Sequence, residues 1–129
     1  MQARSARATI GGAMRTVLIV DDHENFRTTA RALLEADGFE VVGEVGDGDS
    51  VVAEVRRLRP DLVLLDIQLP DSDGFEIAER LGETSDPPAI VLTSSRAESS
   101  YRRQLAGSSA RGFIAKSELS GEALAAFLV

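Results

Sequence analysis

Hydrophobic and polar positions divide the chain into short apolar runs and longer stretches of helical periodicity. Five apolar or β-branched runs bounded by turn signals predict strands. They are Thr16–Val20, Phe39–Val45, Leu62–Asp66, Ala89–Thr93 and Gly112–Ala115. In the third, four apolar residues run into a single aspartate, a pattern typical of a strand that is buried on both faces of a parallel sheet.

Apolar residues recur at helical spacing between these strands. After the first strand, apolar residues at i, i+4, i+7 and i+8 predict a helix that begins near Asn25 as N-cap and stops at Gly38. Further helices are predicted over 51–58, 74–81 and 101–106, and after Ser120. The helix over 101–106 has only Tyr101 and Leu105 as sizeable apolar members, so we expect it to be the least firmly packed.

Five strands that alternate with helices through short loops predict one fold class. It is a doubly wound α/β sheet with right-handed crossovers and strand order 2-1-3-4-5. We expect residues 15–129 to form this single domain. Residues 1–14 are small, polar and punctuated by glycine, so they predict a disordered leader, too short and too weakly patterned for a transit peptide.

Composition excludes several classes of site. The 129 residues include no cysteine and one histidine, which rules out disulfides, thiolate chemistry and a multi-histidine metal centre. No apolar run approaches the roughly 18 residues of a membrane span, and the first fifteen residues lack a signal-peptide core, so we expect a cytoplasmic protein with no membrane contact.

Charge is unevenly distributed along the chain. The net charge is −7, and residues 1–15 carry three of the 14 basic groups and no acid. Residues 16–129 therefore hold eleven basic against 21 acidic groups, a balance of −10. A body this acidic argues against direct binding to nucleic acid.

Polar side chains stand at the ends of four predicted strands. Strand one ends at Asp21-Asp22, strand three at Asp66, strand four at Thr93-Ser94 and strand five at Lys116. The carboxyl ends of parallel strands lie on one edge of the sheet, and these four strands are neighbours in the predicted order. We therefore expect the six side chains to surround one pocket.

This combination of groups suits phosphoryl chemistry. Clustered carboxylates raise one another's pKa, and a hard divalent cation with oxygen ligands, Mg²⁺, relieves that repulsion. A hydroxyl and an ammonium group across from the metal would hold phosphoryl oxygens, and Asp66 becomes the candidate nucleophile for an aspartyl phosphate. No glycine-rich phosphate loop is present, so a bound nucleotide is not indicated.

Each piece also has a plain structural explanation. An acid pair after a strand often forms a cap and a turn, and a single lysine is usually a solvated surface residue. His23 is expected to be an exposed helix-start residue without a catalytic role. The clusters at 47–49 and 71–74 are predicted to be turns, because the second lacks the glutamate that closes a calcium loop. The joint order of acid pair, aspartate, hydroxyl and lysine favours a site.

Four motifs of this sequence resemble those of a known family, the receiver domain of bacterial two-component response regulators of the LuxR or NarL type. The matching motifs are VLIVDD (17–22), LVLLDIQLPDSDGFE (62–76), IVLTSS (90–95) and GFIAK (112–116). The resemblance implies a flavodoxin-like receiver fold and phosphoryl transfer from a sensor histidine kinase to Asp66. It also implies Mg²⁺ held by Asp22, Asp66 and the backbone carbonyl of Gln68, with Asp21 acting largely through water.

The same resemblance implies a switch. Lys116 would contact the phosphoryl group, and the switch hydroxyl 22 positions before it is Ser94, or Thr93 if a one-residue gap intervenes. The switch aromatic would be Phe113. Phosphorylation would then change a surface formed by the fourth helix, fifth strand and fifth helix, which is open to a homodimer or an effector contact.

Three positions depart from the family pattern. Ser117 replaces the usual proline after the lysine, so a cis peptide there is not guaranteed. Ser109 stands where glycine is usual, which predicts strain in the turn before the fifth strand. Phe113 replaces the commoner tyrosine and lacks its hydroxyl.

Two other functions compete with this one. An Mg²⁺-dependent phosphatase with an aspartate nucleophile usually needs a second aspartate two residues later, where this chain has Gln68. A phosphorylation-independent receiver is disfavoured because the acid pair, Asp66, Ser94 and Lys116 are all present. LuxR-type regulators carry a helix-turn-helix domain after the receiver, so the chain is either a stand-alone receiver or part of a longer product.

Overall fold

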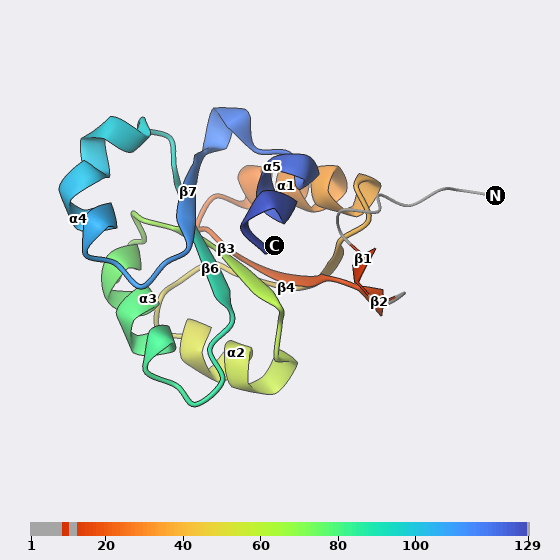
Figure 1. Ribbon diagram of the computed structural model, residues 1–129, viewed down its shortest axis with the longest axis horizontal. Helices are drawn as coiled ribbons and strands as arrows, with labels where there is room; N and C mark the ends of the chain where they lie inside the picture. Colours follow the sequence, from red (N-terminus) through yellow and green to blue (C-terminus); the bar gives the residue numbers. More distant parts are fainter. Residues whose placement is uncertain (1–8, 11–12, 129) are drawn as a thin grey trace.

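Five parallel strands form the centre of the molecule (Figure 1). They are β3 (Thr16–Val20), β4 (Glu40–Val45), β5 (Leu62–Asp66), β6 (Ala89–Ser94) and β7 (Gly112–Ala115). Their spatial order is β4-β3-β5-β6-β7, which is 2-1-3-4-5 in chain order, so the predicted fold class is confirmed. This computed structural model describes residues 9–10 and 13–128.

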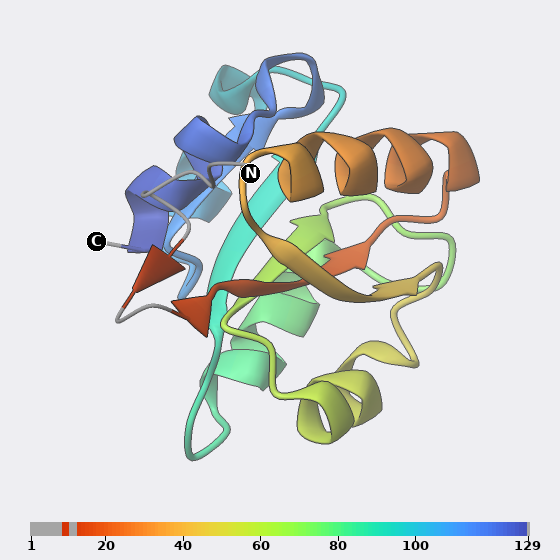
Figure 2. The ribbon, with the colours of Figure 1, turned by 90° about the vertical axis from the view of Figure 1, so that its right-hand side faces the viewer.

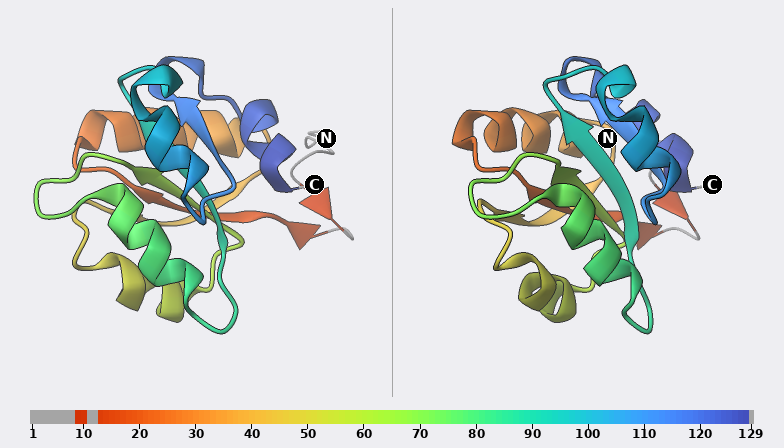
Figure 3. Two further views of the ribbon diagram at one scale, coloured as in Figure 1. Left: turned by 60° about the vertical axis from the view of Figure 1, so that its left-hand side comes forward. Right: turned by 90° about the vertical axis from the view of Figure 1, so that its left-hand side faces the viewer.

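Five α-helices cover the two faces of the sheet (Figures 1 and 2). They are α1 (Glu24–Ala36), α2 (Val51–Leu58), α3 (Gly74–Gly82), α4 (Arg102–Ala106) and α5 (Gly121–Ala125). Three 3-10 turns add to them: η2 (Glu98–Tyr101), η3 (Lys116–Glu118) and η4 (Ala126–Leu128). Helices α1 and α5 lie on one face, and α2, α3 and α4 lie on the other (Figure 3).

The sheet separates the core into two layers. On the α1–α5 side, β5 contributes Leu62 and Leu64, and on the α2–α3 side it contributes Val63 and Leu65. All four side chains are fully buried. Successive side chains of a strand point to opposite faces, so β5 is buried on both sides, as its apolar run predicts. Asp66 is the last residue of this buried strand and therefore lies at the carboxyl edge of the sheet.

Helix α1 begins two residues earlier than the sequence predicts. Its N-cap position is His23, not Asn25, and the His23 side chain makes no capping hydrogen bond. The backbone N–H of His23 instead donates to Asp21 Oδ1 at 2.8 Å. The aspartate at the end of β3 therefore fixes where the helix starts, which is a contact that helix periodicity does not reveal.

The segment predicted as a weak fourth helix has two parts. Tyr101 closes the 3-10 turn η2 and is buried, whereas none of the five residues of α4 is fully buried. The last helix begins as expected at Ser120, whose Oγ accepts a hydrogen bond from the N–H of Ala123 at 3.0 Å. It ends in the 3-10 turn η4.

Strain at Ser109 is not found, which corrects that prediction. Among the described residues, Arg59 alone has a positive φ without being glycine. The N–H and Oγ of Ser109 both donate to Glu79 Oε2, at 2.8 and 3.0 Å. The turn before β7 is thus held by side-chain hydrogen bonds to α3. Residues 9–10 and 13–128 contain no cis peptide bond, so the Lys116–Ser117 bond is trans.

The predicted disordered leader, 1–14, is described at four residues only. There β1 (Thr9–Ile10) and β2 (Ala13–Met14) pair as a short antiparallel ladder, where the sequence predicted no regular structure. Residues 1–8 and 11–12 lie outside the described residues, so disorder there stays a prediction. No helix in the described part of the chain has the length and apolarity that a bilayer crossing requires.

Gly74, the first residue of α3, packs directly against the backbone of Asp66 and Ile67. A Cβ there would lie 2.5 Å from the carbonyl oxygen of Asp66 and 2.7 Å from Ile67 Cα, both backbone atoms. We expect Gly74→Ala to lower the free energy of unfolding by about 1–3 kcal/mol because the backbone must shift, as measured by urea denaturation. Gly107→Ala is the matched control, since its Cβ would meet nothing within 4 Å. Equal losses in both variants would contradict this explanation.

Candidate functional site

Asp66 lies in a buried position at the carboxyl edge of the sheet. Only 3% of the residue is exposed. Its Oδ1 accepts a hydrogen bond from the backbone N–H of Gln68 at 3.2 Å, and its Oδ2 lies 3.5 Å from Lys116 Nζ. The carboxylate therefore has two partners: the N–H of Gln68 in the loop that follows β5, and the ammonium of Lys116, which follows β7.

Lys116 joins Asp66 to a second buried carboxylate. Asp21, at the end of β3, is fully buried, and its Oδ2 lies 2.6 Å from Lys116 Nζ. The ammonium group also lies 4.6 Å from the centroid of the Phe26 ring on α1, in the arrangement of a cation–π contact. One lysine thus contacts two carboxylates and one aromatic ring, all of them distant from it in the sequence.

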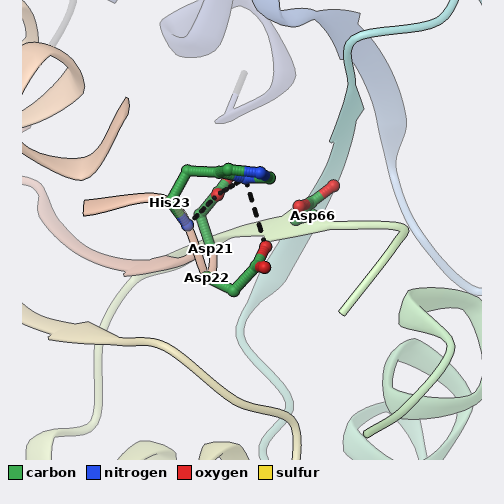
Figure 4. Close-up of side chains that lie close together, drawn as sticks. All are labelled: Asp21, Asp22, His23 and Asp66. Carbon is green, nitrogen blue, oxygen red and sulfur yellow. Dashed lines mark hydrogen bonds and ion pairs between the residues drawn. The ribbon is translucent and has the colours of Figure 1, made fainter. Parts of the chain in front are cut away.

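Asp22 and His23 complete an acidic pocket at the end of β3 (Figure 4). The Nδ1 atom of His23 lies 3.0 Å from Asp21 Oδ1 and 3.2 Å from Asp22 Oδ1. Ligand atoms of Asp21, Asp22, His23 and Asp66 all lie within 4.8 Å of one another. The predicted exposure of His23 is found, with 68% of its side chain exposed, but its contact with both aspartates was not foreseen. Its place directly after the acid pair was the available signal.

Burial and like charge perturb Asp66. Burial raises the pKa of its carboxyl group to about 6, and the negative charge of Asp21 acts in the same direction. The ammonium of Lys116 and the N–H of Gln68 oppose this rise in pKa without cancelling it. Two buried carboxylates share one ammonium, so the pocket has a deficit of positive charge.

The donor set of the pocket fits a hard divalent cation. Asp21, Asp22 and Asp66 offer carboxylate oxygens, and the partly exposed side chain of Asp22 leaves access for water, which Mg²⁺ retains in its coordination shell. Gln68 contributes its backbone N–H to Asp66. The part predicted for the backbone carbonyl of Gln68 as a metal ligand stays a prediction.

The two candidate hydroxyls lie in different surroundings. Thr93 is the register partner of Asp66 across the β5–β6 pair, and its buried Oγ1 has no hydrogen-bond partner among the described residues. The Oγ of Ser94 shares a hydrogen bond with the hydroxyl of Tyr101 at 3.0 Å and accepts the N–H of Arg96 at 3.0 Å. Thr93 is therefore the hydroxyl residue paired in register with Asp66, whereas the hydroxyl of Ser94 is hydrogen-bonded to Tyr101 and Arg96.

Phe113 lies in an aromatic cluster with Tyr101. The residue is 8% exposed, and its ring centroid is 5.9 Å from that of Tyr101, which is in turn 5.9 Å from the ring of Phe75 on α3. The sequence predicts Tyr101 only as an apolar member of a weak helix. The hydrogen bond between Tyr101 and Ser94 depends on the path of the loop 95–100, which the residue pattern does not predict.

The two acidic turns near the pocket bind each other. Asp71 accepts the N–H groups of Gly48 and Asp49 at 2.8 and 3.0 Å, and these hydrogen bonds hold the pKa of Asp71 below its ordinary value. Asp47 accepts the N–H of Ser50 at 2.9 Å. These clusters are turns, as predicted, and they fix the loop after β5 against the loop after β4.

The sheet order and the acidic pocket at its carboxyl edge define a flavodoxin-like receiver fold. The family model described as "Response regulator receiver domain" matches residues 17–127. The chain therefore belongs to the receiver domain family of response regulators.

Individual relatives agree with this assignment. BvgA of Bordetella pertussis is 38% identical over 102 residues, covering 79% of this chain and 49% of its own. The DNA-binding transcriptional activator EvgA of Escherichia coli K12 is 30% identical, covering 84% and 53%. The solved signal receiver domain of NarL from Mycobacterium tuberculosis superposes with a TM-score of 0.76 at 29% identity, covering 88% of this chain and 96% of that one. This chain spans about half the length of the two curated relatives.

The burial of Asp66 beside a second carboxylate predicts a pH-dependent stability. Because its pKa in the folded protein lies above the ordinary 3.8, Asp66 contributes most stability at low pH, and this contribution is lost as pH rises through about 6. We therefore expect Asp66→Asn to be more stable than the unchanged protein at pH ~7.5 by about 1–3 kcal/mol, and the gain to vanish below pH ~4. Urea denaturation in EDTA at several pH values measures this.

Asp86→Asn, which removes an exposed carboxylate, is the control for the general effect of lost charge. It should change stability little at either pH. A gain for Asp66→Asn that is independent of pH would show that relief of a buried charge is not its cause.

Proposed function

We propose that this chain is the phosphoacceptor of a two-component phosphorelay and that Asp66 accepts a phosphoryl group from a sensor histidine kinase. The observation that carries the proposal is the buried carboxylate of Asp66, with Lys116 Nζ 3.5 Å away and a second carboxylate, Asp21, sharing that ammonium. Membership of the receiver family supports the same reading of the pocket.

The transfer step needs an ionised nucleophile. With a pKa of about 6, Asp66 is mostly carboxylate at neutral pH. An oxygen of Asp66 attacks phosphorus and forms a P–O bond, while the bond from phosphorus to the donor histidine nitrogen breaks and the nitrogen keeps the electron pair. No proton is transferred to or from Asp66 in this step.

The residues around Asp66 have separate parts in this proposal. The ammonium of Lys116 lies beside Asp66 and balances charge on the phosphoryl oxygens. Asp21, Asp22 and Asp66, with the carbonyl of Gln68, would hold Mg²⁺, which supplies further positive charge for the same oxygens. A hydroxyl from Ser94 or Thr93 would donate to one oxygen.

The output is proposed to run through the surface of α4, β7 and α5. Phe113 on β7 packs against Tyr101 at the start of α4, so a change near Ser94 reaches this surface through direct contacts. Partners at this surface would be a second copy of the chain or an effector. By analogy with EvgA, which is named as a DNA-binding transcriptional activator, a longer product would carry a DNA-binding domain.

The competing phosphatase function receives no specific support. Its chemistry needs a general acid two residues after the nucleophile to protonate the leaving group. Gln68 stands at that position, and its neutral amide is too weakly acidic to serve as a general acid at neutral pH.

Phosphorylation of Asp66 is testable with a small phosphodonor. We expect acetyl phosphate with Mg²⁺ to add one phosphoryl group to the chain, seen by intact mass, and Asp66→Asn to add none because the nucleophile is gone. Asp86→Asn, at an exposed carboxylate, should be labelled like the unchanged protein. EDTA should reduce labelling by about tenfold or more, since each 1.4 kcal/mol of lost charge stabilisation is tenfold in rate.

Retained labelling of Asp66→Asn would refute the assignment of the nucleophile. Release of inorganic phosphate from p-nitrophenyl phosphate through many turnovers, with no labelled chain, would favour the phosphatase instead.

A further inference from the structure

Tyr101 connects the switch hydroxyl to the aromatic cluster. It is the chain's one tyrosine, and the chain has no tryptophan. The residue is 6% exposed, and its ring lies between Phe75 and Phe113, with centroids 5.9 Å away on each side. Its hydroxyl shares a buried hydrogen bond of 3.0 Å with Ser94 Oγ. The phenol therefore has a fixed position and a single described polar partner.

Ser94 has little freedom left while this bond persists. A serine hydroxyl has one hydrogen and two lone pairs, and Ser94 Oγ already accepts the N–H of Arg96 in addition to its bond with Tyr101. The bond to Tyr101 holds Ser94 among the residues of the α2–α3 side of the core, the layer that contains Tyr101 and Phe113. Thr93, not Ser94, is the register partner of Asp66, and side chains alternate between faces along a strand.

We propose that Tyr101 is a positioning residue that holds Ser94 in a resting position and releases it when the phosphoryl group on Asp66 takes its hydroxyl. This rests on the proposed phosphorylation of Asp66 and deepens it by assigning the restraint that phosphorylation must overcome. Phe113 has no hydroxyl, so the polar contact between switch hydroxyl and aromatic cluster comes from the end of η2.

Release of Tyr101 would act on α4. Tyr101 immediately precedes α4, which itself has no fully buried residue, so the tyrosine is the buried anchor at the helix's start. A cavity of about 270 Å³ lies beside the connecting loop, lined by Arg96, Phe113 and Ser117 among others. The loop between Ser94 and Tyr101 therefore has adjacent space into which to move, and a moved loop would carry α4 with it.

The first test uses Tyr101 as its own probe. With no tryptophan present, tyrosine emission and its quenching by acrylamide report on this residue alone. Acetyl phosphate with Mg²⁺ should raise the quenching constant about twofold or more, because a buried phenol becomes accessible, in the same sample whose intact mass shows the label. Asp66→Asn should show no rise.

The outcomes separate the two proposals. A labelled chain with unchanged quenching would overturn the role of Tyr101 and leave phosphorylation of Asp66 standing. An unlabelled chain would overturn the proposed function itself.

The second test removes the hydroxyl and keeps the ring. In Tyr101→Phe the resting position of Ser94 loses one hydrogen bond, so the apparent affinity for beryllofluoride with Mg²⁺, a phosphoryl mimic, should tighten roughly fivefold. Fluorine NMR of the bound mimic measures it. In a Ser94→Ala background the same substitution should have no effect, because the bond is already absent. Unchanged or weaker affinity in Tyr101→Phe would overturn the proposal, and a damaged fold could not produce tighter binding.

Discussion

A single ammonium group shared by two buried carboxylates determines much of the site. Lys116 lies 2.6 Å from Asp21 and 3.5 Å from Asp66, and both aspartates are almost completely inaccessible to solvent. Removing the ammonium group would leave both carboxylates without compensation, a loss that typically costs about 3–5 kcal/mol for a buried pair. The pocket therefore combines a strong local constraint with an incomplete balance of charge. Burial first and the charge of Asp21 second raise the pKa of Asp66. A site that is short of positive charge is suited to bind a cation and to receive a group that a cation stabilises.

The same contacts also build the fold around the pocket. The Asp21 side chain accepts the N–H of His23 at the start of α1, and the Asp21 carbonyl accepts Arg27 NH1 at 2.6 Å. Phe26, on the first turn of α1, contacts Lys116. On the other side, Gly74 lets α3 begin against the backbone of Asp66. These contacts join the end of β3 to the start of α1 and the end of β5 to the start of α3. The backbone therefore holds the two carboxylates in place.

A second set of contacts, among Ser94, Tyr101 and Phe113, carries no charge. Ser94, Tyr101 and Phe113 connect the end of β6 to the start of α4 and to β7 through one hydrogen bond and one ring contact. These contacts are individually weak, in contrast to the paired charges of Lys116, Asp21 and Asp66. A hydrogen bond typically contributes about 1 kcal/mol, which is small enough for a new partner on Asp66 to compete with it. The proposed release of Ser94 therefore depends on the hydrogen bond to Tyr101 being weaker than the interactions of the charged groups around Asp66.

The sequence by itself determined the sheet, its order and most of the pocket. Asp21, Asp66 and Lys116 each follow an apolar run in the sequence. Their common position is predictable, because parallel strands bring their carboxyl ends to one edge of the sheet. Local periodicity could not give the contacts between elements. These are the hydrogen bond from His23 to Asp21 at the start of α1, the bond from Ser109 to Glu79, and the bond between Tyr101 and Ser94. These depend on where loops place side chains after the core has packed, and loop paths follow from long-range packing, not from residue spacing. The tertiary structure alone therefore decided which hydroxyl faces which partner.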